Sequence, residues 1–599
     1  MSRGRAAGSY NRGVAEGAIK RRLRSARSTV GRAARGVLRL PRATAGAARG
    51  FWSDLSVITR RRLVAALAVF AVLVAFVTLA VPNLPCQFPG GDSCPPPDDA
   101  LELVPADALA YVHANLDPDE EQYVAATEIA DLVPNLSSQL GGRAVAELPG
   151  ADAIAPEFER DVRPWFGGEA AVVVVGGVAD APEQIVLLEV ADADGASDFA
   201  TELAGATDET EEYRGTQLGG DGVGLATARL EDFLAIGRSD GIRALIDVAT
   251  GAEGVTSLAD DPAADELRDE LPDHTLIDAY LSQEGVSELV GDSRGIESSL
   301  APFMAPGTST GAVASVSAAD GALELSVRSA LDTAAAEAEP PFFAAFPPFE
   351  PKIPARLAAD ALGYLGFGDP ATTVQALLGQ AAAQAPAIVS GFEDLARDLR
   401  EQGGVDLEGD LLAGLGSEAA FAVEPRSGDF DLPYLEFVAD GVDEDEARRA
   451  LAALQGPLAD AVDPGSGLQA PVFDEDEIEG VDVRTLRLSP AVELAFAVFD
   501  GLAVVATDPQ GIERLAGTEG GLDESALFAR ATDEFPDEVS MQGFFDLGQL
   551  VSTGENLGLA EDPVYAAFAG EFRRLDAFAF AVSEDESLLI SDAKLVFDE

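Results

Sequence analysis

An internal repeat is the feature that most constrains how this chain can fold. Short blocks recur in the same order, at offsets between 248 and 270 residues. The clearest pairs are DALAY at 107–111 with DALGY at 360–364, GGEAAV at 167–172 with GSEAAF at 416–421, and LLEVAD at 187–192 with LEFVAD at 435–440. The chain is therefore predicted to contain two copies of one domain, at residues 100–332 and 352–599. A Pro- and Phe-rich linker over residues 333–351 separates them.

Each copy mixes predicted strands and helices. Apolar runs at Ala171–Val175 and Ile185–Val190 are typical of buried strands. Asp500-Gly501, between the apolar runs AFAVF and LAVVA, predicts a tight hairpin, as does Asp320-Gly321. Hairpins outnumber strand–helix–strand crossovers, so we expect an α+β fold in which each copy forms an antiparallel sheet with helices on one face.

An uncharged apolar run, Leu63–Val81, predicts a transmembrane helix, because about 28 Å of helix is enough to cross the hydrocarbon core. Arginines at 60–62 precede it, so the positive-inside rule places the N-terminus in the cytoplasm. A cleaved signal peptide is the alternative, although the preceding basic region is longer than such peptides carry. We expect a single N-terminal transmembrane helix followed by the two tandem copies. The predicted location is the cell membrane, single-pass, with the bulk of the chain extracytoplasmic.

Charge is distributed unevenly along the chain. The net charge is −64, yet residues 1–62 carry 16 Arg or Lys and two acids, which leaves −78 on the remainder. We predict that the tail at 1–62 is mostly disordered and lies against anionic lipids of the inner leaflet. The −78 region repels nucleic acid, so its expected partners are the lipid bilayer, through residues 63–81, and an unknown extracytoplasmic protein or polymer. Adaptation to high salt is a further interpretation of such a charge.

The Pro-rich stretch at residues 82–99 predicts a juxtamembrane stalk that contains the two cysteines of the chain, Cys86 and Cys94. Their close spacing beyond a membrane segment favours a disulfide over free thiols. A zinc site would need about four ligands, and no histidine is near in the sequence.

A resemblance to a known family rests on three features. The opening LVPADALAYVHANLDP at 103–118 follows a single predicted anchor, GGEAA forms a predicted strand start, and the arrangement is duplicated. In these features the chain resembles the bacterial domain-of-unknown-function family 3352 over about residues 100–599. The resemblance implies an envelope-anchored protein, and it brings no activity or catalytic residues with it.

Few residues suggest chemistry. The only two histidines, His113 and His274, are expected to be solvated or core residues rather than catalysts. Two G-x-S-x-G matches, centred on Ser293 and Ser309, precede no histidine that could serve as the base of a serine hydrolase. No catalytic, cofactor or metal site is predicted from these residues.

Acidic residues cluster at 192–198 and 440–446, between a predicted strand and a predicted helix in each copy. Helix capping explains both clusters at once and is favoured over calcium binding.

The function predicted from the sequence is that of a non-enzymatic, membrane-anchored extracytoplasmic binding or scaffold protein with an unknown ligand. One alternative is an extracytoplasmic hydrolase that uses carboxylates, with Glu169 and Glu418 as its candidates. Another alternative is a calcium-dependent envelope scaffold.

Overall fold

The computed structural model describes the chain from residue 97 onwards. The described residues belong to one compact unit, Pro96–Glu599. They are 97–133, 148–149, 156–176, 182–203, 210–220, 224–291, 301–305, 307–338, 341–343, 345–384, 386–404, 406–407, 409, 412–426, 432–461, 473–488, 492–517, 520–585 and 587–598. The predicted tail at 1–62, membrane segment at 63–81 and cysteines Cys86 and Cys94 lie outside them.

The first half of the described chain alternates short strands and helices. Its strands are β1 (Ala110–Asn115), β2 (Phe166–Val175), β3 (Glu183–Val190), β4 (Thr210–Tyr213), β5 (Thr216–Gly220), β6 (Leu225–Leu230), β7 (Phe233–Arg238), β8 (Ile277–Ser282), β9 (Ser309–Ala319) and β10 (Ala322–Leu331). Its helical elements are η3 (Asp99–Leu103), α4 (Glu121–Leu132), η4 (Phe158–Val162), α7 (Ala193–Leu203), α8 (Ser239–Ala249), η5 (Leu258–Asp260), α9 (Pro262–Arg268), α10 (Gln283–Gly285), η6 (Val286–Gly291), α11 (Ala301–Met304) and α12 (Thr333–Ala338).

The second half repeats the strand order. Its strands are β11 (Gly363–Gly368), β12 (Glu418–Glu424), β13 (Tyr434–Asp440), β14 (Asp474–Ile478), β15 (Val481–Arg487), β16 (Glu493–Phe499), β17 (Leu502–Ala506), β18 (Met541–Asp546), β19 (Leu575–Asp585) and β20 (Leu588–Phe597). Its helical elements are η8 (Ile353–Ala355), α13 (Pro370–Gln384), α14 (Pro386–Gly403), η10 (Leu412–Gly414), α15 (Glu444–Ala461), α16 (Pro509–Ala516), η11 (Leu522–Glu524), α17 (Ala526–Thr532), α18 (Leu547–Asn556), η12 (Leu559–Glu561) and α19 (Pro563–Phe572).

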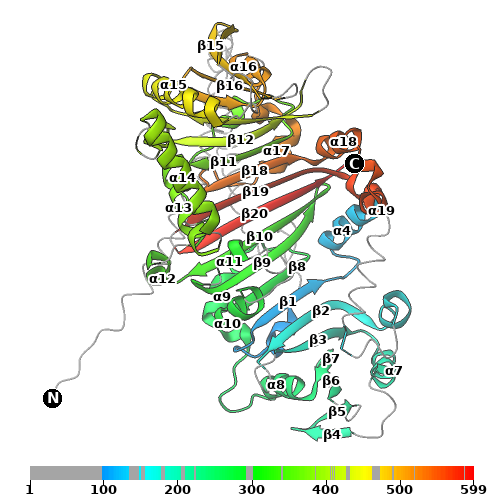
Figure 1. Ribbon diagram of the computed structural model, residues 1–599. Coiled ribbons are helices and arrows are strands. Elements are labelled where there is room, and N and C mark those ends of the chain that lie inside the picture. The colour runs from blue at the N-terminus through cyan, green and yellow to red at the C-terminus, as the bar shows by residue number, and fades with distance from the viewer. Residues whose placement is uncertain are drawn as a thin grey trace, which may run out of the picture. The chain divides into compact units, whose positions relative to one another are not determined.

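The strands of both halves belong to one 20-stranded sheet (Figure 1). Across the first half the hydrogen-bonded order is β4-β5-β6-β7-β3-β2-β1-β8-β9-β10. Across the second half it is β20-β19-β18-β11-β12-β13-β17-β16-β15-β14. All these pairs are antiparallel, and β10 pairs with β20 to join the halves.

The join has pseudo-two-fold symmetry. Strands β10 and β20 begin at equivalent positions of the repeat, which makes Ser326 and Asp592 equivalent, and these two residues lie opposite each other. An axis through this pair, perpendicular to the sheet, therefore relates the two halves. Ion pairs cross the join: Arg328 Nη1 lies 2.7 Å from Asp592, and Lys594 Nζ lies 2.9 Å from Glu324.

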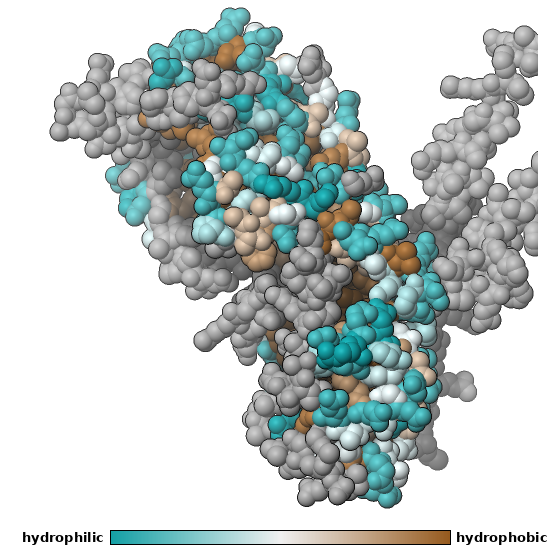
Figure 2. Space-filling model, turned by 90° about the vertical axis from the view of Figure 1, so that its right-hand side faces the viewer, coloured by the Kyte–Doolittle hydropathy of each residue, from teal (hydrophilic) through white to brown (hydrophobic). Residues whose placement is uncertain are grey.

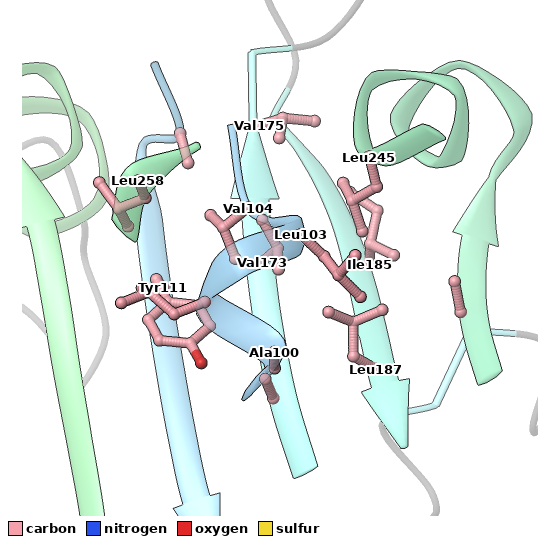
Figure 3. Packing of buried hydrophobic residues seen from close by; sticks show 14 of the residues in the cluster. Ala100, Leu103, Val104, Tyr111, Val173, Val175, Ile185, Leu187, Leu245 and Leu258 are labelled. Atoms are coloured by element: carbon pink, nitrogen blue, oxygen red, sulfur yellow. The ribbon is translucent and has the colours of Figure 1, made fainter. Parts of the chain in front are cut away.

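Helices cover both faces of the sheet. Neighbouring residues of a strand point to opposite faces. In β3, Leu187 packs in the same apolar cluster as Leu245 of α8, whereas Leu188 packs with Phe199 of α7. Figure 3 shows the first of these clusters, in which Leu103 and Val104 lie against the sheet beside Val173. The expectation that helices cover one face alone is therefore wrong, because the sheet has apolar side chains on both faces.

The predicted linker at 333–351 packs closely against the sheet-forming part of the chain. Phe343, Phe346 and Phe349 are buried, and Phe346 is only 2% exposed. Backbone hydrogen bonds in both directions join Phe349 to Val539, with N···O distances of 2.8 and 2.9 Å. The prolines of this stretch keep it out of the sheet interior, while its phenylalanines supply apolar area to the core.

Acidic residues lie on both edge strands of the sheet. Edge strand β14 carries Asp474, Glu475, Asp476 and Glu477, all exposed, and the other edge strand, β4, carries Glu211 and Glu212. Charge at an edge opposes pairing with a strand from another chain.

The side of the molecule in Figure 2 is mainly hydrophilic, with apolar residues in separate small areas.

The predicted fold class is corrected in two respects. The two copies do not form separate sheets, because β10 and β20 unite them. The transmembrane helix, and the single-pass membrane location inferred from it, are contradicted as well. Within the part of the chain that the structure describes, no helix combines the length and apolar character needed to cross a membrane. The fold described here is α+β, with one antiparallel sheet.

Candidate functional site

The first half buries a group of ionisable side chains on one face of the sheet. Strand β1 contributes Tyr111 and His113, which share a face because they are two residues apart. Antiparallel pairing puts Asp278 of β8 directly opposite His113, and Glu169 lies on β2, which pairs with β1 from the other side. Asp98 precedes η3 and completes the group. We call these five residues the His113 cluster.

His113 is oriented through one ring nitrogen. Its Nδ1 atom lies 3.0 Å from Asp278 Oδ1, while Nε2 lies 3.6 Å from Glu169 Oε1 and has no hydrogen-bond partner among the described residues. The side chain is buried, with the residue 3% exposed. Nδ1 is therefore the ring nitrogen on the side of Asp278, and Nε2 is the ring nitrogen on the side of Glu169.

The two acids that share this space are held by donors from several elements. The backbone N–H of Ala100 donates to Glu169 Oε1 at 2.8 Å, which fastens η3 to β2. Tyr111 donates its hydroxyl hydrogen to Asp98, and Arg268 Nη2 lies 2.5 Å from the second oxygen of Asp98. Figure 3 shows Tyr111 and Ala100 on this side of the sheet.

The ligand-type atoms of Asp98, His113 and Glu169 all lie within 4.8 Å of one another. Two carboxylates and an imidazole are a donor set that binds metal ions in proteins. The arrangement can therefore hold a cation between buried oxygen and nitrogen atoms.

The electrostatics of the cluster follow from burial and crowding. Burial raises the pKa of Glu169 to about 7, in spite of the hydrogen bond from Ala100 and the nearby His113. Burial likewise raises the pKa of Asp98, although His113, Arg268 and Tyr111 act against it. Burial acts to lower the pKa of His113, but the hydrogen bond to Asp278 and the surrounding carboxylates outweigh it, so this pKa is raised. The cluster as a whole favours the uptake of positive charge.

The second half keeps part of this arrangement and lacks the rest. The equivalent residues are Tyr364 for Tyr111, Gly366 for His113, Glu418 for Glu169 and Gln542 for Asp278. Glu418 accepts from the backbone N–H groups of Lys352 and Ile353 at 3.0 and 3.1 Å, so it fastens η8 as Glu169 fastens η3. A Cβ atom built on Gly366 would overlap the hydroxyl of Tyr364. The ring of this tyrosine therefore fills the space that an imidazole would need.

Comparison with known proteins places the chain in a family. Residues 63–462 match the family described as "Protein of unknown function (DUF3352)". The chain belongs to this family. The resemblance drawn from the repeat motifs is confirmed, and the His113 cluster lies inside the matched part of this DUF3352 protein.

A search of curated proteins finds no match to the sequence. Among solved structures, crystal form I of TP0453 is 8% identical in sequence, with a TM-score of 0.24 over 40% of this chain and 80% of that chain. Crystal form IV of the same protein is 8% identical, with a TM-score of 0.22 over 39% of this chain and 81% of that chain. Likenesses at this level carry no argument about the function of the DUF3352 chain.

The structure separates the two carboxylates proposed for a hydrolase. Glu169 and Glu418 lie in different halves of the sheet, and each already accepts hydrogen bonds from the backbone of an adjacent helical turn. Ser293 lies outside the described residues, and the hydroxyl of Ser309 is buried against Gly311 and Ser329.

The expected helix caps are confirmed at the start of α7 and α15. Asp192 accepts from the backbone N–H of Asp194 at 3.2 Å, and Asp443 accepts from that of Glu446 at 3.0 Å. In both helices the side chain satisfies a first-turn donor that has no partner within the helix.

Sequence reasoning missed Asp98, Tyr111 and Asp278 as members of one site. His113 was considered alone, and its partners lie on strands far apart in the chain, so the strand order was needed to bring them together. One signal was available: Asp278 interrupts the otherwise mostly apolar stretch LIDAYL.

Proposed function

We propose that this DUF3352 chain is a non-enzymatic binding protein and that its ligand site is the His113 cluster of the first half. The observation that carries the proposal is the difference between two equivalent places in one sheet. The second half forms the same strands around Gly366 and Gln542 that the first half forms around His113 and Asp278. The fold can therefore be built without the imidazole and its facing carboxylate.

Burying ionisable groups opposes folding unless they are well paired, and replacing a whole buried ion-pair network by well-packed apolar residues of similar volume is often neutral or stabilising. The second half forms the same strands without this network, and among the described residues His113 Nε2 has no hydrogen-bond partner. The network is therefore better explained by binding than by stability. Glu169 has a structural task as well, since Glu418 performs the same task in the second half.

Binding is favoured over carboxylate-based hydrolysis for a geometric reason. Glycoside hydrolases place two carboxyl groups on either side of one scissile bond, about 5–9.5 Å apart. The two acids suggested by the sequence, Glu169 and Glu418, sit near the centres of two different halves, separated along the sheet by eight strands from β2 to β12.

The proposal is tested by giving the first half the residues of the second. The double variant His113→Gly with Asp278→Gln reproduces the Gly366–Gln542 pair. We expect its free energy of unfolding in urea to fall by less than about 3 kcal/mol, because the glycine and the space left by the imidazole cost stability while removal of the buried ionisable pair offsets part of that cost. The reverse exchange, Gly366→His with Gln542→Asp, is the matched control and should cost about 3 kcal/mol or more, because Tyr364 occupies the space.

A loss of more than about 3 kcal/mol in the first-half variant would show that the His113 cluster stabilises the fold, and the argument for a ligand site would fail. The control ensures that the urea experiment detects a loss of this size in the same sheet.

A further inference from the structure

The geometry points to a divalent transition-metal ion of the zinc class as the ligand of the His113 cluster, held by His113 Nε2 and by carboxylate oxygens of Asp98 and Glu169. This inference rests on the proposed function, since it names the ligand of the same site. Two independent observations carry it. The three ligand-type atoms lie within 4.8 Å of one another, and Nε2 of His113, a residue that is 3% exposed, has no hydrogen-bond partner in the described part of the chain.

The orientation of His113 is that of a metal-binding histidine. Such a residue donates its second ring N–H to a carboxylate, which fixes the tautomer and makes the ligating nitrogen more basic. Asp278 takes this place, at 3.0 Å from Nδ1, directly across the strand pair. Nε2 then lies on the side of Glu169, and Asp98 belongs to the same group of ligand-type atoms.

The spacing fits a bridging metal ion better than a proton. The 3.6 Å between His113 Nε2 and Glu169 Oε1 is too long for an N–H···O hydrogen bond. Two tetrahedral ligands at bond lengths of 2.0–2.1 Å lie about 3.4 Å apart, close to the separation observed. The widest separation in the group, at most 4.8 Å, would close by at most about 1.4 Å on binding.

The acids keep acceptor capacity for such an ion. Each carboxylate oxygen has about two lone-pair positions. Tyr111 uses one lone-pair position on Asp98 Oδ1, and Arg268 uses one on Asp98 Oδ2. Ala100 uses one position on Glu169 Oε1. These donors orient the carboxylates and leave a lone pair on each oxygen.

The donor set selects the class of metal ion. An imidazole ligand suits zinc, copper, iron or nickel, whereas calcium and magnesium prefer oxygen ligands and more of them. The inferred ion therefore differs from the calcium considered from the acidic clusters at 192–198 and 440–446.

The test is calorimetric titration of the chelator-treated full chain with ZnCl2, alongside CaCl2 at equal ionic strength. We expect one zinc site that His113→Ala weakens at least 100-fold and that Asp278→Asn weakens 10–100-fold, as loss of an orienting partner does. Glu418→Gln, in the equivalent place of the second half, is the control and should leave zinc affinity unchanged. Calcium should produce no saturable heat that depends on His113.

Equal zinc affinity and stoichiometry in wild type and His113→Ala would overturn the inference and assign zinc to surface acids. If His113→Ala does not fold, unchanged zinc affinity in Asp278→Asn has the same consequence. Either result leaves the proposed function standing with a different ligand, provided that the His113→Gly, Asp278→Gln variant keeps its stability. A collapse of that variant removes the proposed function itself.

Discussion

Two tyrosines at equivalent strand positions have opposite surroundings. The hydroxyl of Tyr111 donates to Asp98, whereas the hydroxyl of Tyr364 is buried without a hydrogen-bond partner among the described residues. A hydrogen bond to a charged group stabilises more than a neutral one, and a buried unpaired hydroxyl costs free energy. The same chemical change should therefore have different effects in the two halves.

We predict that Tyr111→Phe lowers the free energy of unfolding by about 1.5–3 kcal/mol, while Tyr364→Phe leaves it unchanged or raises it slightly. Urea denaturation of the two variants at pH 7 measures both changes, and each serves as the control for the other. Equal losses in the two variants would contradict the difference between the halves.

At the residue scale the repeat aligns His113 with Gly366 and Glu169 with Glu418. This alignment did not identify the site, because a lone histidine on a strand is more often a solvated or core residue than a ligand. The residue-by-residue equivalence of β3 and β13 was harder to predict. The match of LLEVAD with LEFVAD aligns Leu187 with Leu435. The pairing of β3 with β2 and of β13 with β12 instead makes Leu187 equivalent to Val438. Short Ala- and Val-rich blocks match at several shifts, so only the hydrogen-bonded register decides.

At the scale of elements, one buried acid in each half fastens a short helix to the sheet. Burial raises the pKa of Glu418 to about 6, above its ordinary value of 4.5, and the hydrogen bonds from Ile353 and Lys352 only partly offset this. The folded state therefore binds this proton more tightly than the unfolded state does. The stability that results is fully present below about pH 4.5 and is lost as the pH rises through 6.

We predict that the stability difference between wild type and Glu418→Gln changes between pH 4.5 and pH 7, with the wild type losing on the order of 1 kcal/mol relative to the variant over this range. Urea denaturation of both proteins across the range provides the measurement. A difference that is constant with pH would show that Glu418 ionises at its ordinary pKa in the folded protein.

The hairpins could be predicted from the sequence, but the face of the sheet on which each helix packs could not. The Asp320-Gly321 and Asp500-Gly501 turns join β9 to β10 and β16 to β17, as predicted. The prediction that helices cover only one face of the sheet was wrong, because strand β3 is apolar on both faces. A continuous apolar run does not show which helices cover it.

At the scale of the whole molecule, the repeat predicted two copies, yet the way they combine depends on their last strands. Nothing in the sequences of β10 and β20 distinguishes a protected edge from a strand awaiting a partner. The pseudo-two-fold join gives the molecule two equivalent places, one with the His113 cluster and one with Gly366 and Tyr364. One chain therefore contains both the proposed ligand site and an equivalent place that lacks its imidazole.

Anomalous diffraction from crystals of the full chain grown with ZnCl2, measured at the zinc absorption edge, tests this account most directly. We predict one strong buried peak in the first half, about 2.0–2.2 Å from His113 Nε2 and from oxygens of Asp98 and Glu169, and no peak beside Glu418. A buried peak beside Glu418, or zinc only at surface acids with His113 Nε2 unligated, would contradict it.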